Sequence, residues 1–282
     1  MLCFTTLSLT MRLLCCHTSL FAQSVVYINP SGMTVETRFN LPEGYVRVSA
    51  SKKSYTTFIR TIRMHRVYTN DLPENLSAGV LNIEKVKSHI LQQDMQLSIC
   101  FRGEYLFRRE QYDKIAFTIS SIGRVPYVPW VEGLKLTIGD KSYFTQRPVS
   151  VDRYQSFCDY LKFIFEHSNI STLLADVQPV ANINDIMVGD MFIQETRPGY
   201  GHVVVVLDVA YNPVTKDRVF LLAKTNQPPQ VAYVLLNPQE AWSGSPWYSI
   251  NVEGDKIVTP DFVFNKKDLR RFKEVPTTSQ RR

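Results

Sequence analysis

The sequence predicts an α+β fold: a mostly antiparallel sheet with a C-terminal strand meander (187–237), packed against two main helices at about 88–109 and 152–167. Both helical segments repeat apolar residues at spacings of three and four positions. After residue 187, four apolar strand-like segments follow one another with short connections. The chain of 282 residues is 44% hydrophobic and 12% aromatic, which is enough apolar side chain for a sizeable core.

Residues 1–22 are predicted to be a signal peptide. Met11 opens a basic-then-apolar run, MRLLCCHTSLFA, which ends in a small residue. The start is either Met1 or Met11. Leucine precedes Cys15, where a lipidated cysteine needs a small residue, so a free exported chain is favoured over a lipid-anchored one. We therefore expect a periplasmic or cell-surface protein. The remaining chain has no apolar run of the roughly 18 residues that cross a bilayer, so we expect no membrane span.

Short elements are expected before the first main helix. Strand-like pieces at 24–30 and 34–40 lead to a turn at Pro42–Tyr45 and a strand, VRVSA. Ser54 is placed to open a short helix. The helix at 88–109 then carries one apolar face, formed by Leu91, Met95, Ser98, Phe101 and Tyr105.

The middle of the chain is predicted to alternate between strands and a second helix. Residues 112–120 alternate as a strand, and 123–148 are rich in Gly, Pro and aromatics, which favours extended segments and turns. The second main helix has either Ser150 or Asp152 as its cap. Its apolar stripe consists of Tyr154, Phe157, Cys158, Leu161, Ile164 and Phe165.

The C-terminal part reads as a meander of four strands. They are predicted at 187–194, 202–211, 218–226 and 231–237. The loop at 212–217 makes a hairpin of the second and third strands. Because no repeat or linker interrupts the chain, residues 24–265 are expected to form a single α+β domain, followed by a basic tail at 266–282.

The charge distribution argues against nucleic-acid binding. The formal net charge is +6, but the tail at 266–282 holds seven basic residues against two acidic ones. Without this tail and Arg12 the body of the protein is neutral. A neutral body with a basic end suits a solvated terminus or weak adhesion to an anionic envelope polymer better than a DNA groove.

His202 is the candidate general base, because it stands at the mouth of a very apolar strand. If the hairpin turn is centred near Val214 and Thr215, antiparallel pairing places His202 opposite Gln227. The amide of Gln227 would then fix the imidazole tautomer. The alternative is that His202 simply ends a strand at the surface.

The cysteines outside the signal are Cys100 and Cys158, which permit one disulfide. Cys158 has the chain order of a papain-like nucleophile. However, it lies inside a helix on the apolar stripe, whereas reactive thiolates favour helix N-termini, so a core position is the better interpretation. The remaining histidines have no metal-ligand spacing, and we predict neither a metal nor a cofactor.

Two further features have structural and functional alternatives. Asp190, in a Gly-Asp strand opener, is expected to be a turn or cap residue rather than a catalytic acid. Trp242, Trp247 and Tyr248 suit either a sugar-binding surface or a packed loop.

The sequence resembles an exported Bacteroidota family known as domain of unknown function 4846. The matching motifs are GMTVETRF (32–39), PEGY (42–45), RGEYL (102–106), YDKIAF (112–117), GDMFIQ (189–194), GHVVVVLDVA (201–210), FLLA (220–223) and SPWY (245–248). They span most of the chain after the signal. The resemblance carries no established activity with it.

One departure from the family pattern concerns the start of the first main helix. The resemblance implies a cysteine after Leu91-Gln92-Gln93, and this chain has Asp94. A cysteine there, followed by the His202 strand, would give the thiol–imidazole layout of papain-like and NlpC/P60-like amidases. A carboxylate does not replace a thiolate in acyl transfer, so this chain is expected to lack papain-type turnover.

Two functions follow as hypotheses. The first is an amide or peptide-bond hydrolase scaffold of the cell envelope, active or inactive, with His202, Gln227 and Asp94 at its site. The second is a non-catalytic periplasmic or surface module that binds glycan or protein. Peptidoglycan or another envelope polymer is the expected partner in either case.

Overall fold

The computed structural model describes residues 26–66, 77–83, 93–138, 143–225 and 231–274. The central sheet contains β1 (Val46–Arg47), β2 (Ser77–Val80), β7 (Val177–Pro179), β8 (Met191–Arg197), β9 (Tyr200–Tyr211), β10 (Arg218–Thr225), β11 (Ala232–Leu235), β12 (Trp247–Ser249) and β15 (Leu269–Phe272). Three separate hairpins are β3 (Ala116–Ile119) with β4 (Gly123–Pro126), β5 (Leu134–Thr137) with β6 (Tyr143–Gln146), and β13 (Lys256–Val258) with β14 (Val263–Asn265). The α-helices are α1 (Val35–Arg38), α2 (Tyr55–Arg60), α3 (Asp94–Arg108), α4 (Val128–Val131), α5 (Arg153–His167) and α6 (Ile170–Asp176). Short 3-10 helices are η2 (Tyr112–Lys114), η3 (Ile183–Asp185), η4 (Pro238–Glu240) and η5 (Lys266–Asp268).

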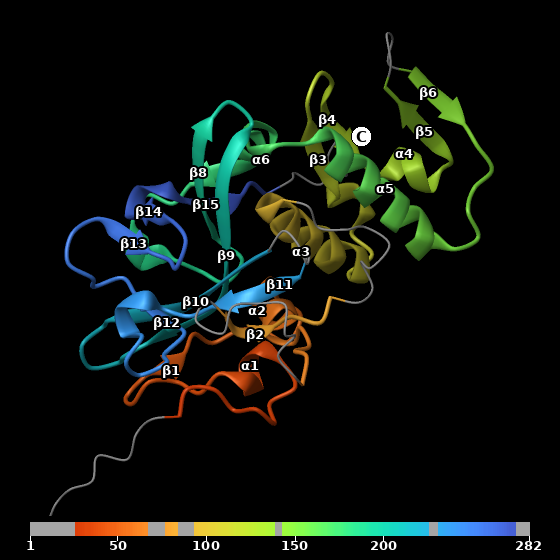
Figure 1. Ribbon diagram of the computed structural model, residues 1–282. Helices are drawn as coiled ribbons and strands as arrows, with labels where there is room; N and C mark the ends of the chain where they lie inside the picture. The colour runs from red at the N-terminus through yellow and green to blue at the C-terminus, as the bar shows by residue number, and fades with distance from the viewer. Residues whose placement is uncertain (1–25, 67–76, 84–92, 139–142, 226–230, 275–282) are drawn as a thin grey trace, which may run out of the picture.

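The strands pair in the order β2-β11-β10-β9-β8-β15-β7, with β1 added to β9 and β12 to β10. Every pair is antiparallel. Helix α3 lies between this sheet and α5, as Figure 1 shows. The predicted α+β fold, with its C-terminal meander and two main helices, is therefore confirmed.

Helix α3 is the centre of the core. Its side chains from Met95 to Leu106 are buried, apart from the half-buried Tyr105. Gly103 allows close packing on α5, because a Cβ there would lie 3.2 Å from Phe157 and 3.3 Å from Leu161. A helix whose middle is buried between a sheet and a second helix is held in a fixed position by this packing.

The hairpin register agrees with the predicted turn. Arg218 lies opposite Tyr211, as a turn centred near residues 214 and 215 requires. A bulge between Leu221 and Leu222 then shifts the register by one position. Gln227 lies outside the described residues, so its pairing with His202 stays a prediction.

The N-terminal strand prediction is wrong at 34–40. Residues Val35–Arg38 form the short helix α1, and the hydroxyl of Thr34 accepts a hydrogen bond from the backbone N–H of Thr37 at its start. A polar cap of this kind stabilises one helical turn even where β-branched residues favour a strand. The predicted Ser54 and Asp152 caps are both present, on α2 and α5.

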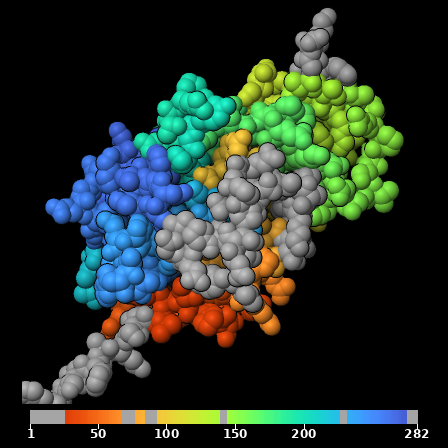
Figure 2. Space-filling model, viewed as in Figure 1, coloured from red at the N-terminus to blue at the C-terminus, as the bar shows by residue number. Residues whose placement is uncertain are grey.

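A buried carboxylate ties the N-terminal segment to the sheet. Asp208 of β9 is fully buried, and its two oxygens accept hydrogen bonds from Arg47 Nε at 2.6 Å and Arg60 Nε at 2.7 Å. Figures 1 and 2 both show the N-terminal segment, in red to orange, next to the C-terminal strands. The two arginines neutralise a charge that the apolar strand could not otherwise bury.

Candidate functional site

Three elements meet at one open cavity of about 450 Å³. The N-terminus of α3 contributes Gln93 and Asp94, the start of β9 contributes Tyr200 and His202, and the end of β10 contributes Lys224 and Thr225. Two of the predicted site residues, Asp94 and His202, therefore line one cavity although they lie far apart in the sequence. The third, Gln227, lies outside the described residues.

Asp94 is the first residue of α3. Its Oδ1 accepts a hydrogen bond from the Thr225 hydroxyl at 3.1 Å, and its Oδ2 lies 3.6 Å from Lys224 Nζ. Burial raises the pKa of this carboxyl, while Lys224, the Thr225 hydrogen bond and the His202 imidazole act in the opposite direction. The N-terminal end of the helix dipole also favours a negative charge at this position. The site thus holds an anchored carboxylate.

Lys224 links two acidic residues. Its ammonium lies 2.5 Å from Asp261 Oδ2, and the same ammonium faces Asp94. The residue is only 9% exposed, so it needs such partners. Lys224 and Asp261 were not predicted as site residues from the sequence. The available signal was a lysine in the otherwise apolar strand VFLLAKT, because a charge there requires a counter-ion from another segment.

His202 has a different neighbour. Its ring stacks on Phe262, with centroids 3.9 Å apart and an interplanar angle of 27°. Both Asp94 and His202 are described residues, and no hydrogen bond or ion pair joins them. The opposite residue on β8 is Gln194, whose Oε1 is buried and has no hydrogen-bond partner. Gln194 therefore places an amide opposite His202. This amide comes from β8, whereas Gln227 was predicted to face His202 from the other neighbouring strand.

The cysteines are not at this site. Cys100 and Cys158 are free and buried, so the disulfide that the composition permitted is not formed. Burial raises the pKa of the Cys158 thiol to about 11 and also raises that of Cys100. Both are core residues within helices, where thiolate formation is disfavoured. Within the described part of the chain, no group of three potential metal ligands is present.

The aromatic cluster has a mainly structural role. Trp247 and Tyr248 are buried, with Trp247 Nε1 donating to the Asn40 carbonyl at 2.8 Å. The Tyr248 hydroxyl donates to the Leu236 carbonyl at 2.6 Å. Trp242 alone is exposed, at 86%. Two of the three rings are thus unavailable to a sugar.

Asp190 has the structural role that its Gly-Asp context indicated. Its carboxylate accepts a hydrogen bond from the Met187 backbone N–H at 2.8 Å, and it pairs with Arg271 of β15 at 2.6 and 2.7 Å. It is 1% exposed and lies away from the cavity residues. This ion pair fastens β15 to the start of β8.

The fold and the cavity together define an α+β protein with a charged site between a helix N-terminus and two strand ends. A family model described as domain of unknown function (4846) matches residues 35–271, and the chain belongs to this family. No curated protein and no solved structure is significantly similar to it. Among the described helices, none combines the length and apolar character of a membrane span.

Proposed function

We propose that this chain is an exported protein of the cell envelope that binds a ligand at the Asp94–His202 cavity without thiol-dependent hydrolysis. The observation that carries the proposal is the anchored Asp94 carboxylate at the N-terminus of α3. A papain-like amidase needs a thiolate at such a position, with the imidazole in contact. Here Asp94 contacts Thr225 and Lys224, and His202 contacts Phe262.

The chemistry of the cavity suits a short peptide that carries both charges. Asp94 is a partner for an amine, while Lys224 and His202 are partners for a carboxylate. A volume of about 450 Å³ is within the usual range for small-ligand sites. The stem peptides of peptidoglycan carry both amines and carboxylates, and they are the proposed ligand class.

Titration calorimetry with soluble muropeptides tests the proposal. Wild-type protein should bind them and leave them intact by liquid chromatography. Asp94→Ala should weaken binding by about tenfold or more, because a hydrogen bond to a charged group contributes about 1.5–3 kcal/mol. Asp113→Ala is the matched control, since Asp113 is an exposed aspartate on η2 outside the cavity. Equal binding by both variants contradicts the proposal.

The second candidate is a hydrolase in which His202 acts as a general base toward water. It is favoured by the presence of an imidazole and a carboxylate with raised pKa in one cavity. Its test is product formation from the same muropeptides. Turnover by wild-type protein that disappears in His202→Ala would support it and replace the binding proposal.

A further inference from the structure

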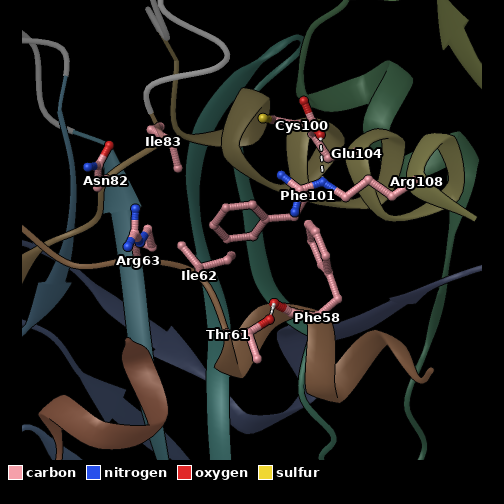
Figure 3. A pocket seen from close by; sticks show the side chains of 10 residues that line it. All are labelled: Phe58, Thr61, Ile62, Arg63, Asn82, Ile83, Cys100, Phe101, Glu104 and Arg108. Atoms are coloured by element: carbon pink, nitrogen blue, oxygen red, sulfur yellow. Dashed lines mark hydrogen bonds and ion pairs between the residues drawn. The ribbon is translucent and has the colours of Figure 1, made fainter. Parts of the chain in front are cut away.

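A second hollow lies between α2 and the C-terminal half of α3. Figure 3 shows Phe58, Ile62 and Phe101 turned toward this space, with Arg63 on one side and Arg108 on the other. Its volume is about 450 Å³. A smaller cavity of about 280 Å³ shares Phe58, Thr61 and Arg108 with it. The two cavities therefore adjoin each other, and together they form what we call the α2–α3 groove.

The groove is strongly basic. Its rim carries Lys52, Lys53, Arg63, Arg108 and Arg109. Lys52, Lys53, Arg63 and Arg109 form no ion pair with any described residue.

The acidic residue lining the described groove is Glu104, and its charge is already balanced. Its oxygens accept hydrogen bonds from the Tyr154 hydroxyl at 2.5 Å and from Arg108 Nε at 3.2 Å. Among the described residues, the groove therefore carries more positive than negative charge.

The dipole of α3 explains the positions of only two of these basic residues. Arg108 and Arg109 stand at the C-terminal end of α3, where cations interact favourably with the helix dipole. Lys52 and Lys53 come from the loop before α2, and Arg63 from the bridge with Thr34. Bringing like charges together from three segments costs repulsion, which a bound anion would relieve.

The aromatic side chains of the groove indicate which kind of anion it binds. Phe58 and Tyr105 are partly exposed, and their ring centroids lie 5.8 Å apart. The guanidinium carbon of Arg108 is 5.2 Å from the centre of the Phe58 ring. A guanidinium over a ring face adds to the aromatic surface and still has N–H groups that can donate to a carboxylate. Flat apolar surfaces flanked by cations suit sugar rings that carry carboxylates.

We propose that the α2–α3 groove binds an acidic polysaccharide of the uronic-acid type. The sugar faces lie on Phe58 and Tyr105, and the carboxylates pair with Lys52, Lys53 and Arg63. An open groove along two adjoining cavities fits an extended chain of sugars better than the acyl chain of a lipid, which needs an enclosed apolar tunnel.

This site is independent of the Asp94–His202 cavity. Asp94 begins α3 and Arg108 ends it, so the two sites lie about 20 Å apart at a rise of about 1.5 Å per residue. Loss of one binding activity with retention of the other therefore distinguishes the two proposals.

The experiment measures binding of the folded chain to polygalacturonate and to neutral dextran by biolayer interferometry. Wild-type protein should prefer polygalacturonate, and the preference should fall as salt is raised, since the contacts are ionic. The triple variant Lys52→Gln, Lys53→Gln, Arg63→Gln should bind polygalacturonate at least about tenfold more weakly. Thermal melting checks that the variant stays folded.

The control variant removes the same charge elsewhere. Lys162→Gln, Lys256→Gln, Lys267→Gln changes three exposed lysines outside the groove and should retain wild-type affinity. Equal loss in the two triple variants, equal binding of dextran, or preference for anionic phospholipid vesicles over polygalacturonate would each overturn the proposal.

Discussion

The ammonium of Lys224 lies 3.6 Å from a carboxylate oxygen of Asp94, and this ion pair joins the end of β10 to the start of α3. Lys224 also pairs with Asp261 at 2.5 Å. The helix N-terminus, the strand and the segment before β14 are therefore fastened by one side chain. The charge arrangement of the cavity depends on Lys224.

Lys224→Met should destabilise the protein by about 2 kcal/mol, because it leaves the largely buried carboxylate of Asp94 and the more exposed one of Asp261 without their cation. Urea denaturation at neutral pH measures the free energy of unfolding. Lys256→Met is the control: this exposed lysine donates to Asn265 Oδ1, and its loss should change stability by less than about 0.5 kcal/mol. Similar losses in both variants would rule out the linking role of Lys224.

Asp94 should make stability fall as the pH rises. Its pKa in the folded protein is raised from the ordinary value of 3.8, chiefly by burial. Between the ordinary and the raised pKa the folded state binds more protons than the unfolded state, so the contribution of Asp94 decreases through this window and is constant above it. Asp94→Asn has no such proton to lose, so its stability relative to wild type should rise as the pH increases through this window. The gain is about 1.4 kcal/mol for each tenfold difference in proton affinity between the folded and unfolded carboxyl. Urea denaturation across this pH range measures it, and a difference that is independent of pH contradicts this assignment.

Asp208→Asn should be among the most destabilising conservative changes. It removes the charge that Arg47 and Arg60 share and leaves two guanidinium groups against a buried strand. Breaking a buried ion pair from one side typically costs about 3–5 kcal/mol. Chemical denaturation of Asp208→Asn beside Asp113→Asn, an exposed control, measures the difference. A loss below about 1 kcal/mol would mean that water replaces the carboxylate.

The two tryptophans should respond in opposite ways. Trp247→Ala removes a buried indole and its hydrogen bond to Asn40, at a cost of about 3–5 kcal/mol. Trp242→Ala removes an exposed ring and should change stability by less than about 0.5 kcal/mol. Thermal melting compares them. Loss of glycan binding in Trp247→Ala would therefore report unfolding, and Trp242 is the position at which to test an aromatic contact.

Asp94→Cys should produce a thiol whose ionisation depends on Lys224. The N-terminus of α3 and the Lys224 ammonium favour a thiolate, but burial, which outweighs them at Asp94, raises the pKa of an acid here. We therefore expect the pKa of this thiol to lie above that of an exposed Asp113→Cys, and to rise further when Lys224→Met is added. The pH profile of iodoacetamide alkylation measures both shifts. An alkylation profile that is unchanged by Lys224→Met would show that the ammonium does not act on this position.

Sequence patterns predicted the elements with strong periodicity. Apolar runs define β8 to β11, and the stripe from Tyr154 to Phe165 defines α5. Short elements were harder: the Thr34 cap outweighed strand propensity in α1. A cap is a single polar contact, and the sequence does not distinguish it from a turn residue.

The site was predictable only in part, for a physical reason. Asp94 and His202 stand at the ends of strongly patterned elements, so their positions followed from the fold. Their partners did not: Asp261 and Phe262 come from a loop between short strands, and no periodicity places that loop beside β9 and β10. The bulge between Leu221 and Leu222 could not be predicted from the sequence either, because both residues are ordinary apolar strand formers.

The Asp208 bridge also has a consequence for synthesis. Arg47 and Arg60 leave the ribosome 161 and 148 residues before their carboxylate does. Until β9 is made, the two guanidinium groups have no buried counter-ion, and β1 has no strand to pair with. The N-terminal third therefore cannot take up its final arrangement as an early unit during translation. We therefore expect a chain that stops before β9 to be cut by proteases in this segment more readily than the full chain.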